Sequence, residues 1–305
     1  MPESQSPSSM TPPRTPIFLQ DSQIRVGNAL ISRITEIAHW PFPAKLLFPD
    51  ISADQLASIK NPALFDQDSG ELILAIHSYL IELADTRLLV DPGNGSAKER
   101  PALLAHHQLE TDFPGTLRAA GYSPEKIDLV ISTHLHPDHC GGNTQLVTGD
   151  WQPTFPQAQY LFGRIGLTEL TALTHKSELS AIEEDFLRLF DDSIKPVLDS
   201  GLAKIVDEDQ ILLRDGSTEV RVIPTPGHTA GHLAVEVSAA DGSGALISGD
   251  IIHHPVQLRY PELSQAGDES AKQARETRDW LLERSAATGW PILTTHFVES
   301  DPKAN

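Results

Sequence analysis

The sequence predicts a single α/β domain with strand pairs in the interior, helices outside them and functional polar residues at the strand ends. Short apolar runs such as Ile127–Ile131 are typical of buried strands, and stretches with helical spacing of apolar residues separate them. Several runs are followed directly by His or Asp beside Gly or Pro, which stop the strand. The 305 residues contain no short repeat and no long linker, so we expect one domain.

The composition is that of a soluble globular protein with an acidic surface. Hydrophobic residues make up 39% and charged residues 21%, and 42 Asp and Glu against 23 Lys and Arg give a formal charge of −19. This surface repels phosphate backbones and anionic lipids, so we expect a small-molecule substrate and neither nucleic acid nor membrane as partner. No apolar run approaches the ~18 residues that span a bilayer, and the single Cys140 excludes an intrachain disulfide. We therefore expect a cytoplasmic location.

The first residues of the chain are expected to lie outside the domain. Residues 1–20 are rich in Ser, Pro and Thr, and they lack the basic start and apolar centre of a secretion signal. This composition favours a flexible or loosely docked tail. The folded domain is therefore predicted to comprise residues 21–305.

The first part of the domain predicts strands and one proline-interrupted segment. Apolar and polar residues alternate over residues 24–37, and Leu72–Leu83 with Thr86–Val90 predict a strand pair. Between them, His39–Pro49 is apolar and aromatic but contains three prolines, which exclude a regular helix or a central strand. We expect this segment to pack on the core; an apolar flap over a ligand pocket is the alternative.

Four polar residues near this strand pair each have a structural and a functional interpretation. Asp91, at the end of the second strand, either caps the following Gly-rich turn or orients a metal-bound histidine, and in isolation the turn is favoured. His77, within the first strand, is expected to be packed rather than to bind metal. His106 and His107 lie in a polar helical stretch and are expected to be solvated.

The densest group of metal-ligand candidates follows the predicted strand Ile127–Ile131. Within six positions the chain holds three imidazoles and one carboxylate, which belong to His134, His136, Asp138 and His139. Imidazole and carboxylate together suit zinc or a similar divalent ion better than calcium or magnesium. Cys140 follows directly, and because no base is placed beside it we expect a small buried thiol rather than a nucleophile.

The second half of the chain repeats the order of strand followed by ligand. Glu178–Phe190 and Ser270–Ala287 predict helices. Further strands are predicted at Val220–Ile223, Leu233–Val237, Ala245–Ser248 and Pro291–Thr295. The ligand candidates associated with these strands are His228, Asp250 and His296, whereas His232 is expected to support the site rather than to bind metal. Seven ligands are what two ions with one shared carboxylate require, so the count favours a dinuclear catalytic site over a structural zinc.

These motifs, in this order, resemble the metallo-β-lactamase fold superfamily. The resemblance rests on Thr133–His139, Gly227-His228, Ser248–Asp250 and His296, and it covers roughly residues 25–297. It implies a four-layer αβ/βα sandwich with the metals at one edge, between the two halves. It also implies the ligand assignment, in which the first ion binds His134, His136 and His228, the second binds Asp138, His139 and His296, and Asp250 bridges them.

A narrower resemblance indicates one subgroup of hydrolases. Thr225–His232 and Ser248–Gln257 are similar to methyl-parathion-hydrolase-like enzymes and to quorum-quenching lactonases of the acyl-homoserine-lactone type. Many of these lactonases carry Tyr three residues after the bridging Asp, where this chain has His253. The residues that select the substrate are expected around Trp40–Phe48 and His253–Tyr260, and the first of these segments also allows a homodimer.

The resemblance implies a dinuclear metal-dependent hydrolase. Two divalent ions, zinc first and manganese or iron(II) as alternatives, lower the pKa of a bridging water, and the resulting hydroxide attacks a lactone or ester carbonyl. Asp138 and Asp250 are the expected catalytic carboxylates. His253 or His254 is expected to donate a proton or a hydrogen bond to the leaving group, with a packing role in the loop as the alternative.

The same metal motif allows other activities. Phosphotriester hydrolysis is the runner-up, and a glyoxalase-II-like thioesterase ranks below it because no basic C-terminal segment suits a glutathione-sized anion. β-Lactam hydrolysis ranks lower because those enzymes commonly vary these ligands, and the charge of −19 disfavours a nuclease. Outside hydrolysis, the alternative is a di-iron redox protein, although such relatives tend to add a carboxylate and a flavin module, of which this chain shows no sign.

Overall fold

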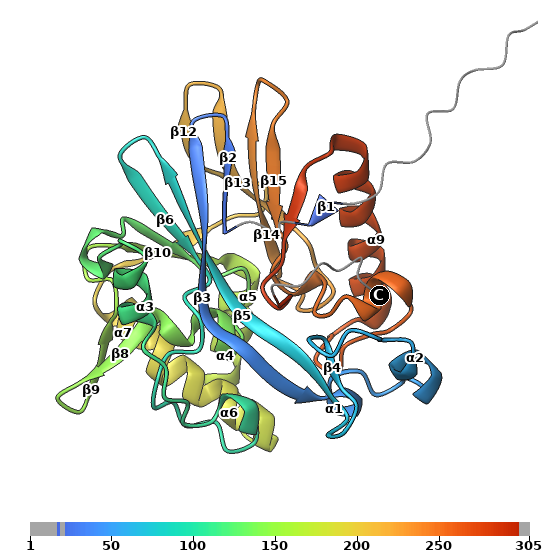
Figure 1. The fold of residues 1–305 in the computed structure, drawn as a ribbon. Coiled ribbons are helices and arrows are strands. Elements are labelled where there is room, and N and C mark those ends of the chain that lie inside the picture. The colour runs from blue at the N-terminus through green and yellow to red at the C-terminus, as the bar shows by residue number, and fades with distance from the viewer. Residues whose placement is uncertain (1–16, 19–21, 299–305) are drawn as a thin grey trace, which may run out of the picture.

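Two β-sheets lie face to face at the centre of the molecule, and helices cover the outer face of each sheet (Figure 1). The structure is a computed structural model and describes residues 17–18 and 22–298. The layers confirm the predicted α/β class and the four-layer αβ/βα sandwich. Apart from Ile17 and Phe18, the predicted N-terminal tail lies outside the described residues.

The larger sheet has eight strands in the described chain and carries the first ligand motif. Its order is β11-β10-β7-β6-β5-β3-β2, with β4 paired to β5 beside this path. The strands are β2 (Gln23–Val26), β3 (Ala29–Pro43), β4 (Phe65–Asp66), β5 (Glu71–Leu83), β6 (Thr86–Val90), β7 (Leu129–Ile131), β10 (Gln159–Gly163) and β11 (Ala203–Val206). Because β6, β7, β10 and β11 are parallel, their carboxyl ends meet at one edge.

The smaller sheet has six strands in the described chain, in the order β1-β16-β15-β14-β13-β12. The strands are β1 (Ile17–Phe18), β12 (Ile211–Asp215), β13 (Thr218–Pro224), β14 (Leu233–Ala239), β15 (Gly244–Ile247) and β16 (Pro291–Leu293). β1 pairs in parallel with β16, so two residues of the predicted tail join this sheet. A separate hairpin consists of β8 (Thr144–Val147) and β9 (Asp150–Pro153).

Helices form the two outer layers and the connections near the ligand motifs. They are α1 (Ala44–Leu47), α2 (Ala53–Ala57), α3 (Phe113–Ala119), α4 (Pro137–Cys140), α5 (Arg164–Ala172), α6 (Ala181–Leu189), α7 (Lys195–Asp199), α8 (Val256–Arg259) and α9 (Ala271–Thr288). Helices α3, α5, α6 and α7 cover the larger sheet, and α9 covers the smaller one (Figure 1). Within the described residues, no helix is long and apolar enough to cross a membrane.

The core between the sheets follows from the alternation of side chains along each strand. Ile81 on β5 and Val90 on β6 are fully buried against Val222 and Val235 of the facing sheet. Burying each such side chain stabilises the fold by about 1.5–3 kcal/mol. The interior is therefore a rigid base from which the strand ends project the polar residues.

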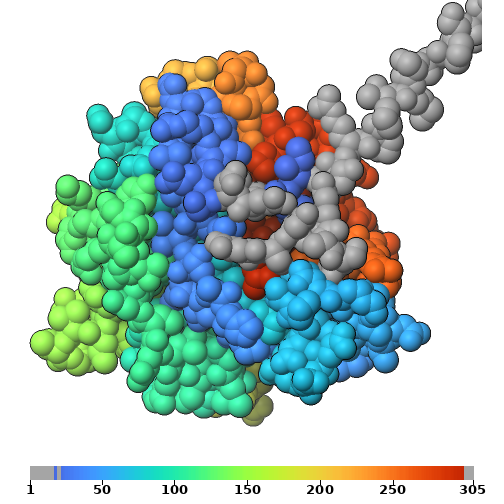
Figure 2. All heavy atoms as spheres, in the orientation of Figure 1, coloured from blue at the N-terminus to red at the C-terminus, as the bar shows by residue number. Residues whose placement is uncertain are grey.

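The proline-interrupted segment His39–Pro49 packs on the core, as expected. Its first part continues β3 beside β5, and it tolerates prolines because β2 pairs only with Ala29–Ser32 of β3, so this stretch is a sheet edge. Phe48 is fully buried, and Trp40 is 9% exposed. Figure 2 shows β2 and β3 as a continuous band across one face of the molecule.

Candidate metal centre

The ligand motif begins where β7 ends, at the edge of the larger sheet. After Ile131 the chain turns through buried Thr133 and His134 into α4, a single helical turn that carries Asp138 and His139. Proline at the start of α4 fixes the turn, and a 3-10 helix over Gly141–Asn143 follows it directly. The local sequence therefore directs four ligand-type side chains into a small buried volume.

The seven predicted ligands lie together in two groups that share one residue. The first group consists of His134, His136, His228 and Asp250, and the second consists of Asp138, His139, Asp250 and His296. Within each group the ligand atoms all lie within 4.8 Å of one another. The other three residues follow strands of the smaller sheet. His228 comes after β13, Asp250 after β15 and His296 after β16.

Asp250 lies between the groups and presents one carboxylate oxygen to each. Its Oδ1 is 3.0 Å from Nε2 of both His139 and His296. Its Oδ2 is 3.5 Å from Nε2 of His228 and 3.8 Å from Nε2 of His134. A carboxylate in this position can coordinate two ions at once.

The donor atoms fit two divalent cations. Nε2 of His134, Nε2 of His139 and Oδ1 of Asp250 are buried and form no well-aligned hydrogen bond within the described structure. Each such atom costs about 1–3 kcal/mol unless a partner satisfies it. Burial also lowers the pKa of His134 and His136 well below the usual range, which keeps both imidazoles neutral and able to coordinate. Nitrogen and oxygen donors without sulfur suit zinc, manganese or iron(II).

Asp91 orients the second group from the end of β6. Its Oδ2 lies 2.9 Å from Nδ1 of His139, and its Oδ1 accepts a hydrogen bond of 2.7 Å from the backbone N–H of Thr133. The backbone of Asp91 has φ of +54°, an uncommon conformation for a residue other than glycine. The structure thus favours the orienting role of Asp91 over the turn-capping role that its sequence context suggested.

Three carboxylates lie close enough to His139 to shift its pKa. Burial favours its neutral ring, but Asp250, Asp138 and Asp91 outweigh burial and raise the pKa of His139 well above the usual range. His296, in the same group, is fixed by a hydrogen bond of 3.0 Å between its Nδ1 and the carbonyl oxygen of Ala75 on β5. Both imidazoles therefore turn Nε2 toward Asp250.

His228 is held by the loop that precedes α9. Gly227 has φ of +135°, and a Cβ there would lie 2.2 Å from the backbone nitrogen of Ala274 in α9, so only glycine fits. Nδ1 of His228 is 2.9 Å from Oδ1 of Asp268. Asp268 is the orienting residue that the sequence did not reveal, because it lies in a polar turn and follows no predicted strand.

His232 supports Asp250 and does not belong to either ligand group, in agreement with its predicted structural role. Its Nε2 accepts a hydrogen bond of 3.0 Å from the backbone N–H of Asp250, and its Nδ1 is 2.8 Å from Oγ1 of Thr225. Burial lowers the pKa of His232 to about 3, so the ring stays neutral and can accept this hydrogen bond. Gly249 has φ of +51°, and a Cβ there would lie 2.7 Å from Nε2 of His232.

His253 and His254 occupy different environments. Nε2 of His253 is 3.1 Å from Oδ2 of Asp250, and neither ring nitrogen forms a well-aligned hydrogen bond within the described structure. His254 points away from the site: its Nε2 is 3.0 Å from the carbonyl oxygen of Leu64, and its Nδ1 accepts from the backbone N–H of Val256. Of the two, only His253 can face a substrate.

The family assignment follows from the ordered motifs and from a match over most of the chain. A model of the metallo-beta-lactamase superfamily matches residues 73–296. The chain belongs to this superfamily.

Curated relatives include lactonases of the same superfamily. An N-acyl homoserine lactonase from a Bacillus species is 26% identical over 194 residues, which cover 59% of this chain and 66% of that protein. The match thus spans just under two thirds of the relative. A metallo-beta-lactamase fold-containing protein of Sulfurisphaera tokodaii is 28% identical over 145 residues, 42% of this chain and 49% of that protein.

Solved structures of the superfamily confirm the fold. The hydrolase AbOPH superposes with a TM-score of 0.71 at 24% identity, covering 92% of this chain and 90% of that chain. AidC, a dizinc quorum-quenching lactonase solved with a product, superposes with a TM-score of 0.65 at 20% identity, covering 90% and 89%. At these identities the likeness concerns the fold alone.

In this member of the superfamily, the metal centre opens into a cavity of about 680 Å³. The segment Trp40–Phe48 contributes to its wall, as expected, whereas His253 is the one lining residue in the predicted stretch His253–Tyr260. Most of the remaining wall outside the ligand motifs comes from residues 102–106, from α5 and α6, and from residues 265–269. These segments carry no metal-ligand pattern, so the sequence did not indicate them.

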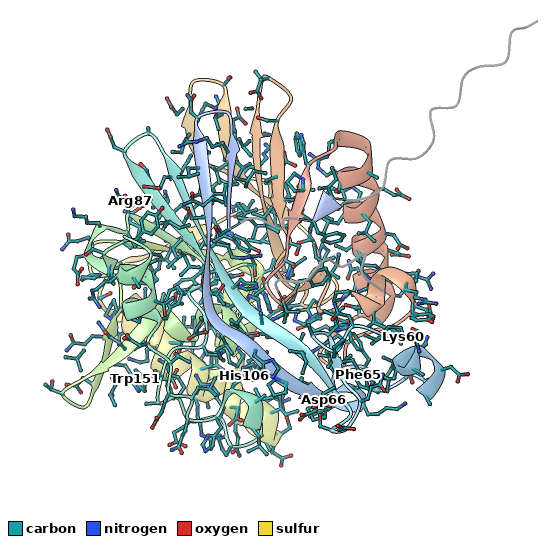
Figure 3. All side chains as sticks on the ribbon, viewed as in Figure 1. Lys60, Phe65, Asp66, Arg87, His106 and Trp151 are labelled. Carbon is teal, nitrogen blue, oxygen red and sulfur yellow. The ribbon has the colours of Figure 1, made fainter. Side chains whose placement is uncertain are left out.

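The prediction that His106 is solvated is wrong. His106 lines the cavity, its Nδ1 is 2.8 Å from Oδ1 of Asn94, and its ring packs edge-on against Trp40 at 5.2 Å between centroids. Figure 3 shows His106 beside β3. His77 and Cys140 are buried and packed, as expected.

Proposed function

We propose that the protein is a dinuclear metal-dependent hydrolase that attacks the carbonyl of a lactone or ester. The observation that carries this proposal is the position of Asp250, whose two oxygens face two complete ligand groups at a cavity with mostly apolar walls. The lactonases among the relatives support a lactone or ester as substrate. We propose zinc as the metal; the cytoplasmic location and the homodimer stay predictions.

The geometry divides the work among named residues. Two divalent ions, when bound, supply a water of lowered pKa and polarise the substrate carbonyl. Asp250 fixes the spacing of the two ligand groups, and Asp138 completes the second one. His253 faces the cavity beside Asp250 and donates a hydrogen bond to the leaving oxygen as the carbon–oxygen bond breaks.

Phosphotriester hydrolysis remains the second candidate. Among the described residues, no Lys or Arg side chain lines the cavity, so the wall suits an uncharged phosphotriester as well as an uncharged ester. The same wall offers no Lys or Arg side chain to a glutathione thioester or to the carboxylate of a β-lactam, and both therefore rank below the uncharged substrates.

A hydrolysis panel with the metal-loaded enzyme tests the proposal. The panel contains an acyl lactone, an aryl ester, a phosphotriester, a thioester and a cephalosporin, and His175→Gln, an exposed histidine outside the cavity, is the control. We expect turnover of the lactone or aryl ester and unchanged rates in the control. Absence of turnover across the panel contradicts a hydrolase, and stoichiometric iron with redox-active absorption bands favours the di-iron alternative.

The role of His253 has its own test. Replacing it with Phe removes the hydrogen bond to the leaving oxygen, so kcat falls by roughly tenfold or more for an alkyl ester, whose leaving group is poor. An aryl ester, which leaves without this help, changes little, and His253→Gln, which keeps a donor, recovers part of the loss. Equal losses for both esters assign His253 to packing instead.

A further inference from the structure

The charges on the cavity wall all have one sign. Apart from the metal ligands, the charged residues that line the cavity are Glu169 and Glu269. No Lys or Arg from the described chain accompanies them. Exposed apolar side chains also line the cavity, namely Leu46, Leu104 and Ile182, which are 62%, 74% and 50% exposed.

The two glutamates flank the loop that carries His228. Glu269 is tied to this loop twice: its Oε2 accepts a hydrogen bond of 2.7 Å from the backbone N–H of Ala230, and its own N–H donates to the carbonyl oxygen of His228 at 3.0 Å. Glu169 lies on α5, which packs directly on the loop, since a Cβ on Gly231 would lie 2.4 Å from the backbone nitrogen of Gly166.

The two carboxylates influence each other electrostatically. Partial burial, and then the charge of Glu269, raise the pKa of Glu169 above its ordinary value. Both residues are nevertheless exposed and line the cavity. The exposed part of the cavity wall thus combines apolar side chains with a pair of carboxylates.

We propose that Glu169 and Glu269 select the substrate by charge. The cavity admits lactones or esters with a large apolar group that is uncharged or cationic, and the two carboxylates reject a substrate that carries a negative charge at the far end of that group. This inference rests on the proposed hydrolase function. Its physical basis is Coulomb repulsion by two exposed carboxylates of the cavity wall, which has no Lys or Arg side chain from the described residues to neutralise them.

Three aryl esters of equal chain length test the proposal. Their acyl chains end in a methyl group, a carboxylate or an ammonium group, and kcat/KM is measured for each. In the double variant Glu169→Gln/Glu269→Gln, we expect the preference for the methyl over the carboxylate ester to fall roughly fivefold. The preference for the ammonium over the methyl ester falls as well, because the two carboxylates of the wild-type enzyme attract the ammonium group.

A matched control removes two acidic charges elsewhere. Glu208→Gln/Glu276→Gln changes exposed residues outside the cavity and leaves the three rates in their wild-type ratio. Glutamine at position 269 keeps an oxygen for the N–H of Ala230. Raising the salt concentration on the wild-type enzyme tests the same point without a variant, since screening weakens the discrimination.

The outcomes separate the two proposals. Turnover of all three esters with no charge preference, or equal rejection of both charged chains, overturns the charge selection and leaves the hydrolase intact. A preference that survives in the glutamate double variant also overturns the assignment to these residues. No turnover of any ester contradicts the hydrolase function and the charge selection together.

Discussion

The two ligand groups at the metal centre are held in different ways. In the second group, His139 is oriented by Asp91 at the end of β6, and His296 by the carbonyl oxygen of Ala75 on β5. In the first group, His228 is oriented by Asp268, which belongs to a loop before α9. His139 and His296 of the second group are therefore oriented from the larger sheet, whereas His228 of the first group depends on a loop that also lines the cavity.

This difference assigns separate tasks to the two groups. Strands in the core hold their positions to within small fluctuations, so ligands anchored to them bind an ion in a fixed geometry. Both groups face the cavity, the first through His136 and His228 and the second through Asp138 and His296. The loop that orients His228 lines the cavity as well. Substitutions in the cavity wall are therefore expected to affect the binding of the first ion more than that of the second.

The largest effect is expected from Asp250→Ala, which breaks both groups at once. Without the shared carboxylate, each group keeps three protein ligands but loses the link between them. We expect the content of tightly bound zinc to fall below two ions per chain and kcat to fall on the order of a thousandfold. Metal analysis after dialysis, together with the hydrolysis panel, measures both. Two tightly bound ions with full activity contradict the bridging role.

Asp91→Asn is expected to weaken the second group selectively. The backbone N–H of Thr133 requires the amide oxygen, so the new NH₂ group faces Nδ1 of His139. The imidazole must then accept at Nδ1 and carry its proton on Nε2, where the ion binds. We expect the affinity of one zinc ion to fall by about a hundredfold and that of the other to change little.

A chelator titration that resolves the two ions checks this expectation. Asp138→Asn, which removes a ligand of the second group directly, supplies the reference curve. The Asp91→Asn protein should weaken the same step of the titration. If both steps weaken equally, Asp91 supports the whole edge of the sheet and not one ligand group.

Asp268→Asn is expected to weaken the first group, and by less. Oδ2 of Asp268 accepts a hydrogen bond of 3.0 Å from the backbone N–H of Gln265, so the oxygen of the new amide is needed there. Its NH₂ group then faces Nδ1 of His228, which is the same conflict as at position 91. A loop can rearrange to relieve this conflict more easily than a strand end, so we expect a loss of about tenfold in the affinity of one ion. His136→Gln supplies the reference curve, and a loss as large as that of Asp91→Asn removes the distinction between loop and sheet.

The clustering of the candidate metal ligands could be predicted from the sequence because the first motif is local. His134, His136, Asp138 and His139 lie within six residues, and their spacing after a buried strand indicates a site whatever the rest of the chain does. Asp91 was recognisable as a candidate because it ends a strand. Its role was decided only by the parallel pairing of β6 with β7, which brings it beside His139.

The cavity could not be predicted because its wall is assembled from distant segments. His106 lies between the apolar residues 102–105 and the polar pair His107 and Gln108, and only the packing of Trp40 against it shows that it faces the cavity. Asp268 and Glu269 look like ordinary turn residues, because nothing in their local pattern encodes the contact with His228 and Ala230. Residues that select a substrate depend on tertiary contacts, which a single sequence does not display.

The smallest effect is expected from Leu104→Ser in the exposed part of the cavity wall, which should leave both ligand groups unchanged. Leu104 is 74% exposed and lines the cavity, so a long acyl chain covers only part of its side chain. Losing about one methylene of contact lowers kcat/KM roughly threefold for a decanoyl ester and leaves an acetyl ester unaffected. Leu146→Ser, at an exposed leucine of β8 outside the cavity, is the matched control and changes neither rate. A weaker zinc affinity in Leu104→Ser, or equal losses for both esters, shows that this side chain acts through the metal centre and not through contact with the chain.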